Sequence, residues 1–213
     1  MHTGNPTKYR VLQYLIRTHE SRGDKILVFC DRPHILEYYA KRLKYAVIHG
    51  EVSSDERLKI YKLFKTSNEV NVIFLSRVGD TAIDLPCANV AIQLGMHFKS
   101  RRQEVQRMGR IMRAKDNPNN EFNAFFYTLV SLDTKEVLYS NIRQRCLIDQ
   151  GFQYEILLEE NLEYHEEPHK HRYIKNLDEL AYLQDLLINS QEGDLHIEDQ
   201  SHVVPIQRKK LLS

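Results

Sequence analysis

The order of apolar and polar residues along the chain predicts five short strands, each an apolar run typical of a strand buried on both faces. The five runs cover residues 25–30, 46–49, 71–76, 89–94 and 123–130. Segments with helical periodicity separate most of them. Strands that alternate with helices are typical of a parallel sheet covered on both sides, so we predict an α/β fold with a doubly wound sheet.

Start and stop signals bound the predicted helices. The first helix ends before Gly23, and the second begins at Pro33, a residue suited to a first helical turn. Ser53 and Glu56 form a capping box at the start of a third helix, and residues 134–150 form a long later helix. The first helix is expected to bury Tyr9, Leu12, Leu15, Ile16 and His19. The third is expected to bury Leu58, Tyr61, Leu63 and Phe64.

The pattern changes near residue 158, so we expect one main domain with an appendage. Residues 6–158 form the domain, and residues 1–5 are read as a leader or an added remnant. Residues 159–213 form an acidic, partly flexible C-terminal extension, which begins as a linker and includes a short amphipathic helix at 177–188. We expect this extension to dock another subunit.

Composition excludes several classes of protein. The chain has 213 residues, 42% of them hydrophobic, with a formal net charge of +1. No apolar run approaches the roughly 20 residues that span a bilayer, so no membrane segment is expected. Three widely spaced cysteines favour a reducing, intracellular compartment. We predict no metal site, because the grouped histidines match no closed zinc set; they are His165, His169 and His171.

Positive charge is concentrated in one segment. Residues 99–115 contain seven Lys or Arg and one Glu, and a Ser100–Gln103 capping box places the segment on a helix. Arginines occupy every third position around Gly109; they are Arg107, Arg110 and Arg113. The guanidinium fork suits phosphate oxygens, which predicts contact with a phosphate. A solvated basic face is the alternative.

Polar residues follow the predicted strands at their carboxyl ends, where parallel sheets bind ligands. His49 and Gly50 follow the second strand, and the helix that begins after Ser53 offers its N-terminus to a phosphate. Ser53 could instead be a structural cap only. Asp84 could accept a hydrogen bond from a ribose or could close a turn before Pro86, and the sequence leaves both readings open.

The machinery that normally holds ATP is missing from the chain. None of its eight glycines is followed by Lys, so it has no GxxxxGK[ST] phosphate-binding loop. The two Asp-Glu pairs begin predicted helices and do not follow strands. The sequence therefore predicts half of a catalytic site.

Several blocks carry a family resemblance. "SRVGDTAIDLPCANVAIQ" (76–93) and "QRMGRIMRA" (106–114) resemble motifs V and VI of superfamily 2 helicases, and "ILVFCD" (26–31) resembles motif IV. Together with "GNPTKYR", "NAFFYTLVSLDT" and "RQRCLIDQGF", they are very similar to the second RecA-like domain of the XPB family, the translocase subunits of the transcription and repair factor TFIIH. The resemblance covers about residues 5–158.

The resemblance implies roles for individual residues. The arginine fingers that reach the γ-phosphate of ATP correspond to Arg110 and Arg113, and Gln106 approaches the same phosphate. The other residues implied in nucleotide binding are Asp84, Gly79 and Arg107, with a structural role as the alternative for Arg107. The residues implied in contacts with the DNA backbone are His49, Gly50, Ser53, Ser76 and Arg77.

The family also implies partners. ATP and Mg²⁺ would be held mainly by the first RecA-like domain, which with DNA and TFIIH-type subunits completes the expected partners. The expected activity is 3'-5' translocation in transcription initiation and nucleotide excision repair, in the nucleus. The alternatives are a non-catalytic RecA-like interaction module, in which the arginines only form salt bridges, and a stand-alone nucleic-acid-binding domain.

Overall fold

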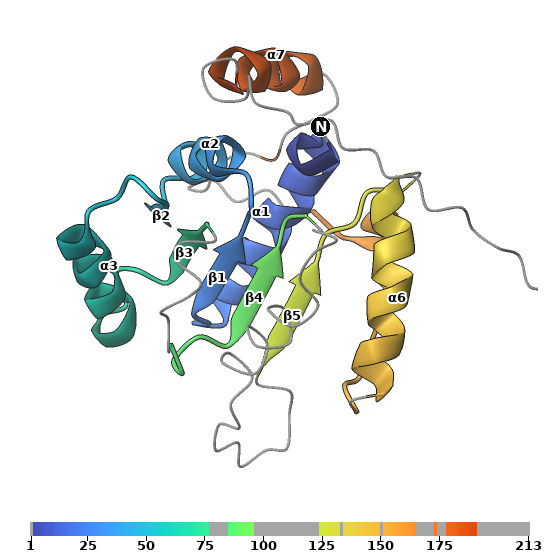
Figure 1. The fold of residues 1–213 in the computed structure, drawn as a ribbon, viewed down its shortest axis with the longest axis horizontal. Coiled ribbons are helices and arrows are strands. Elements are labelled where there is room, and N and C mark those ends of the chain that lie inside the picture. Colours follow the sequence, from blue (N-terminus) through green and yellow to red (C-terminus); the bar gives the residue numbers. More distant parts are fainter. Residues whose placement is uncertain are drawn as a thin grey trace, which may run out of the picture.

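The computed structural model has a five-stranded, all-parallel sheet with strand order β2-β3-β1-β4-β5 (Figure 1). The strands are β1 (Ile26–Phe29), β2 (Ala46–Ile48), β3 (Val72–Leu75), β4 (Val90–Gln93) and β5 (Phe125–Thr128). The structure describes residues 2–76, 85–95, 124–132, 134–149, 151–164, 173 and 178–190. All five strands predicted from the sequence are confirmed, as is the α/β class.

Helices cover the sheet on both faces. They are α1 (Pro6–Ser21), α2 (Pro33–Leu43), α3 (Ser54–Thr66), α6 (Lys135–Asp149) and α7 (Glu179–Ser190), with short 3-10 turns η1 (His2–Gly4) and η2 (Glu159–Asn161). Figure 1 shows α6 beside β5 and α7 outside α1 and α2. Within the part of the chain that the structure describes, no helix combines the length and apolar character needed to cross a membrane.

Alternate residues of each inner strand face opposite sides of the sheet, as the period of two requires. In β1, Ile26 and Val28 pack with α1 and α2, whereas Leu27 and Phe29 pack on the side of α3. β3 repeats this division in register with β1. Because both faces are covered, every residue of these strands is buried, which explains the continuous apolar runs.

The structure confirms the residues predicted to begin or end α1, α2 and α3. Gly23 has φ +76°, and it ends α1 by a left-handed turn that a side chain would strain. Pro33 occupies the first turn of α2. The Ser53 side chain accepts a hydrogen bond from Glu56 N at 3.3 Å and caps α3. All five residues expected on the buried face of α1 are buried.

The predicted apolar face of α3 is wrong in part. Phe64 is fully buried, but Leu58 is 66% exposed and Leu63 is 41% exposed. α3 meets the sheet through Phe64 with Ile60 and Tyr61, a narrower face than the sequence pattern suggested. Leu58 and Leu63 lie to either side of this face, so the helix turns them away from the sheet.

Parts of the C-terminal extension pack on the main domain. In η2, Glu159 pairs with Arg10 of α1 at 3.1 Å, and Tyr173 lies under the Arg17 guanidinium at 4.0 Å from the ring centroid. α7 buries Tyr182 and Leu186 in the same core as α1 and α2. The pattern of the sequence predicts a linker and a docking helix here, whereas these described parts of the extension contribute to the packing of the domain itself.

Tyr182 gives α7 its firmest contact and supplies a test. Its hydroxyl donates to Tyr39 Oη at 2.7 Å, and its ring lies 5.5 Å from that of Tyr9. We expect Tyr182→Ala to lower the free energy of unfolding by about 3 kcal/mol, because it opens a cavity in the core. Urea denaturation followed by circular dichroism measures this.

The matched control is Ile188→Ala on the same helix. Ile188 is 71% exposed, so its truncation should change stability by less than about 0.5 kcal/mol. Equal effects of the two substitutions would contradict the packing of α7 on the domain.

Candidate functional site

The carboxyl ends of the strands form one edge of the sheet. At this edge, backbone hydrogen bonds between neighbouring strands continue one residue beyond the strand ends. Beyond the strands, Cys30 N donates to Leu75 O at 3.1 Å, and Ser76 N donates to Ile48 O at 3.0 Å. Leu94 N likewise donates to Phe29 O at 2.9 Å. The residues that follow β1, β3 and β4 are thereby fixed side by side at the edge where parallel sheets bind ligands.

The loop after β2 is held rigidly by one arginine of α3. Arg57 donates through Nη2 to His49 O at 3.0 Å and to Gly50 O at 2.9 Å. Its Nε donates to Val52 O at 2.8 Å. The three carbonyls lie outside the helices and strands, so this one cation supplies hydrogen bonds that regular secondary structure would otherwise provide. His49 O also accepts a hydrogen bond from Val52 N at 3.3 Å.

His49 reaches from this loop to α2. Its Nε2 lies 3.2 Å from Glu37 Oε1, and the imidazole is 13% exposed. Glu37 also pairs with Lys41 across one helical turn at 3.4 Å. This cluster places an imidazole and a carboxylate at the carboxyl end of β2, next to the N-terminus of α3.

Ser53 and Ser76 have different surroundings. Ser53 is exposed at the N-terminus of α3, where free backbone N–H groups and the helix dipole favour an anion. Ser76 is 5% exposed, and its Oγ has no hydrogen-bond partner among the described residues. The structure thus brings together His49, Gly50, Ser53 and Ser76 at the β2–β3 part of the edge.

The other predicted site residues lie outside the described residues. They are Arg77, Gly79, Asp84, Gln106, Arg107, Arg110 and Arg113. The segments that carry them follow Ser76 and Gly95, which both lie just beyond carboxyl ends of strands. Their roles remain predictions from the sequence.

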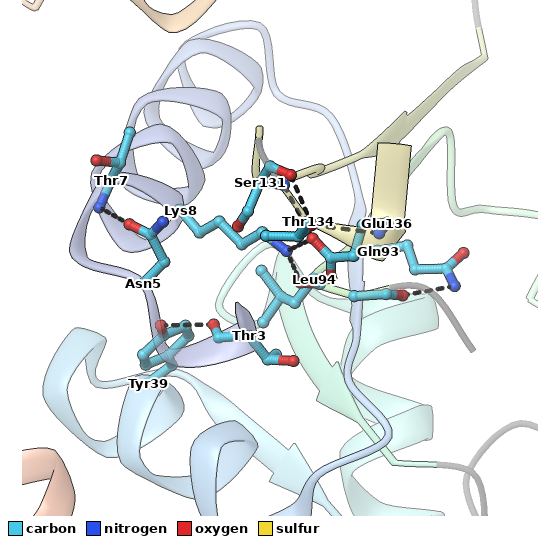
Figure 2. Close-up of polar contacts among 11 residues, drawn as sticks. Thr3, Asn5, Thr7, Lys8, Tyr39, Gln93, Leu94, Ser131, Thr134 and Glu136 are labelled. Atoms are coloured by element: carbon cyan, nitrogen blue, oxygen red, sulfur yellow. Dashed lines mark hydrogen bonds and ion pairs between the residues drawn. The ribbon is translucent and has the colours of Figure 1, made fainter. Parts of the chain in front are cut away.

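A buried charge pair fixes the end of β4 (Figure 2). Lys8 Nζ of α1 lies 2.6 Å from Glu136 Oε2 of α6, and the two side chains are 4% and 8% exposed. Lys8 Nζ also donates to Leu94 O at 3.2 Å, and Ser131 N donates to the same Glu136 oxygen at 2.9 Å. One network therefore joins α1, the end of β4, the segment after β5 and α6.

The electrostatics of this network depend on burial. Desolvation lowers the pKa of Lys8 below its usual value, while the hydrogen bond to Glu136 and its charge oppose that change. Neither residue was singled out from the sequence, because a buried charge leaves no mark in apolar periodicity. Arg57 was missed for the same reason: it follows the capping-box Glu56 and resembles any exposed helical cation.

Breaking the buried pair should be costly. Lys8→Met or Glu136→Gln should each lower the free energy of unfolding by about 3 kcal/mol, because each leaves one buried charge without its partner. The double substitution Lys8→Met/Glu136→Gln should lose clearly less than the sum of the two. Urea denaturation of the four proteins gives the coupling energy.

Lys41→Met is the matched control, since Lys41 is 75% exposed in its pair with Glu37. It should change stability by no more than about 0.5 kcal/mol. Additive losses from the Lys8 and Glu136 substitutions would contradict a coupled pair.

Comparison with solved structures supports the fold. The crystal structure of the C-terminal part of the Fun30 ATPase domain is similar with a TM-score of 0.50, covering 87% of this chain and 54% of that one. The identity is 20%, so this likeness concerns the RecA-like α/β fold alone.

Curated relatives and a family match identify the chain more closely. It is 54% identical over 153 residues to the "General transcription and DNA repair factor IIH helicase/translocase subunit XPB" of Encephalitozoon cuniculi, covering 72% of this chain and 23% of that protein. It is 44% identical over 198 residues to the XPB/SSL2 subunit of Saccharomyces cerevisiae, covering 89% of this chain and 22% of that protein. Residues 1–210 match the ERCC3/RAD25/XPB C-terminal helicase family, and the chain therefore belongs to that family.

Proposed function

We propose that the chain is the second RecA-like half of an ATP-dependent 3'-5' DNA helicase/translocase that acts in transcription initiation and nucleotide excision repair. The observation that carries the proposal is the family match over residues 1–210. The chain spans less than a quarter of the length of the two relatives described above. It contains no phosphate-binding loop, so the proposed activity needs a second domain that holds ATP.

The proposed chemistry is charge stabilisation across a domain interface. The first RecA-like domain holds ATP with Mg²⁺, and Arg110 and Arg113 approach the γ-phosphate from this chain. Gln106 lies near the same phosphate. Guanidinium groups stabilise the negative charge that spreads over the transferring phosphoryl group, and they act only when the two domains close. Asp84, Gly79 and Arg107 complete the nucleotide contacts.

The β2–β3 part of the edge is the proposed DNA contact. The Arg57-bound loop with His49 and Gly50 precedes the N-terminus of α3, whose free N–H groups suit a phosphate. Ser53 and Ser76 would add hydroxyl donors at this edge, and Arg77, the next residue in the sequence, would add a cation. Contacts of this kind position a strand without reading its sequence, and domain closure and reopening would move them along the DNA.

The proposed setting follows from the relatives. They are named as subunits of general transcription and DNA repair factor IIH. We therefore propose TFIIH-type subunits as partners of this chain and the nucleus as its location.

The first test concerns the arginine fingers. In the full-length protein that joins this chain to a first RecA-like domain, Arg110→Ala should lower DNA-stimulated ATP hydrolysis by about three powers of ten while nucleotide affinity is largely kept. Steady-state hydrolysis and nucleotide titration measure the two quantities.

Arg145→Ala removes the same charge from an exposed position on α6 and should leave turnover unchanged. Unchanged turnover in the Arg110 variant, with assembly lost instead, would favour the non-catalytic interaction module.

A second test uses the chain by itself. The 213-residue chain should hydrolyse no ATP with or without DNA, because it contains no phosphate-binding loop to hold the nucleotide. A phosphate-release assay with purified chain measures this. DNA-stimulated turnover by the chain alone would contradict the division of the site between two domains.

A further inference from the structure

Three potential metal ligands meet at the carboxyl end of β2. Glu37 comes from α2, and His49 and Glu51 come from the loop that Arg57 holds. One ligand atom from each residue lies within 4.8 Å of the other two. We propose that Glu37, His49 and Glu51 form a binding site for a divalent transition-metal ion, with Zn²⁺ as the best match.

The spacing of two donors already suits tetrahedral coordination. With bonds of about 2.0–2.1 Å, ligand atoms on one tetrahedron lie about 3.3 Å apart. His49 Nε2 and Glu37 Oε1 are 3.2 Å apart. Glu51 is exposed, so its carboxylate can move to complete the third corner without disturbing the core. The fourth position is left for water or another oxygen donor.

The backbone that carries two of the donors is fixed in advance. Arg57 binds the carbonyls of His49, Gly50 and Val52, and Val52 N donates to His49 O at 3.3 Å. Binding therefore needs only the ordering of the Glu51 side chain and of Glu37, whose pair with a highly exposed lysine is weak. A fixed loop lowers the entropy cost of binding.

The donor set selects among cations. One imidazole nitrogen with two carboxylates suits Zn²⁺ and its neighbours in the first transition series, whereas Mg²⁺ prefers six oxygen ligands. The prediction of no metal site rests on the grouped histidines His165, His169 and His171. The set with Glu37 leaves no local motif in the sequence, because Glu37 is supplied by a different helix.

The experiment is a titration of the whole chain with Co²⁺, a spectroscopic substitute for Zn²⁺. We expect the visible absorption of tetrahedral Co²⁺ at a ratio of one ion per chain, its loss when Zn²⁺ is added, and a higher melting temperature with Zn²⁺. His49→Gln and Glu51→Gln should each weaken binding by about tenfold or more. Melting of each variant without metal confirms that it is folded.

Two control variants distinguish binding at this site from binding by other metal-ligating side chains. Glu69→Gln removes an exposed carboxylate near the opposite edge of the sheet and should bind as the unaltered chain does. A triple change of His165, His169 and His171 to Gln should also leave binding intact. Absence of saturable binding, or binding lost only in the triple variant, would overturn the proposal. No nucleotide or DNA is used, so the outcome is independent of the proposed function.

Discussion

The parallel alignment of all five strands is the constraint on which the rest of the structure depends. It places every carboxyl end at one edge, and hydrogen bonds such as Ser76 N to Ile48 O carry the ladder one residue further. The chain leaves this edge at Ser76, where the stretch that resembles motif V begins, and at Gly95, which precedes the stretch that resembles motif VI in the sequence. The topology of the sheet by itself therefore brings several loops to one side, where they can act together on a ligand with several phosphates.

That edge is held by polar contacts between distant parts of the chain. The Lys8–Glu136 pair joins residues 128 apart in sequence and anchors the carbonyl of Leu94. Arg57 performs a similar task for the loop after β2. Both cations are bound to protein oxygens, so their contribution is to hold the backbone in place. The loop clamped by Arg57 carries both the proposed DNA contacts and two of the proposed metal ligands.

The sequence predicts elements better than it predicts contacts. Continuous apolar runs locate all five strands, because β1, β3 and β4 are buried on both faces and the outer strands β2 and β5 are partly buried. Local caps such as Gly23 and Ser53 locate helix ends. Contacts between distant residues leave no periodic signal, so the Lys8–Glu136 pair and the packing of Tyr182 were not foreseen. The predicted apolar face of α3 is too wide, because the periodicity of apolar residues does not show how much of a helix the sheet covers. Of the predicted site residues, the structure describes those that follow strands β2 and β3, which are His49, Gly50, Ser53 and Ser76.

The central claim is that the carboxyl edge of the sheet faces both DNA and nucleotide. Hydrogen exchange of the full-length protein, with and without DNA and a non-hydrolysable ATP analogue, tests it most directly. The account predicts added protection at residues 49–53 with DNA and at 106–113 with nucleotide, and no change at the opposite edge, in residues 23–25 and 67–71. Protection at the opposite edge, or none at the carboxyl edge, would contradict it.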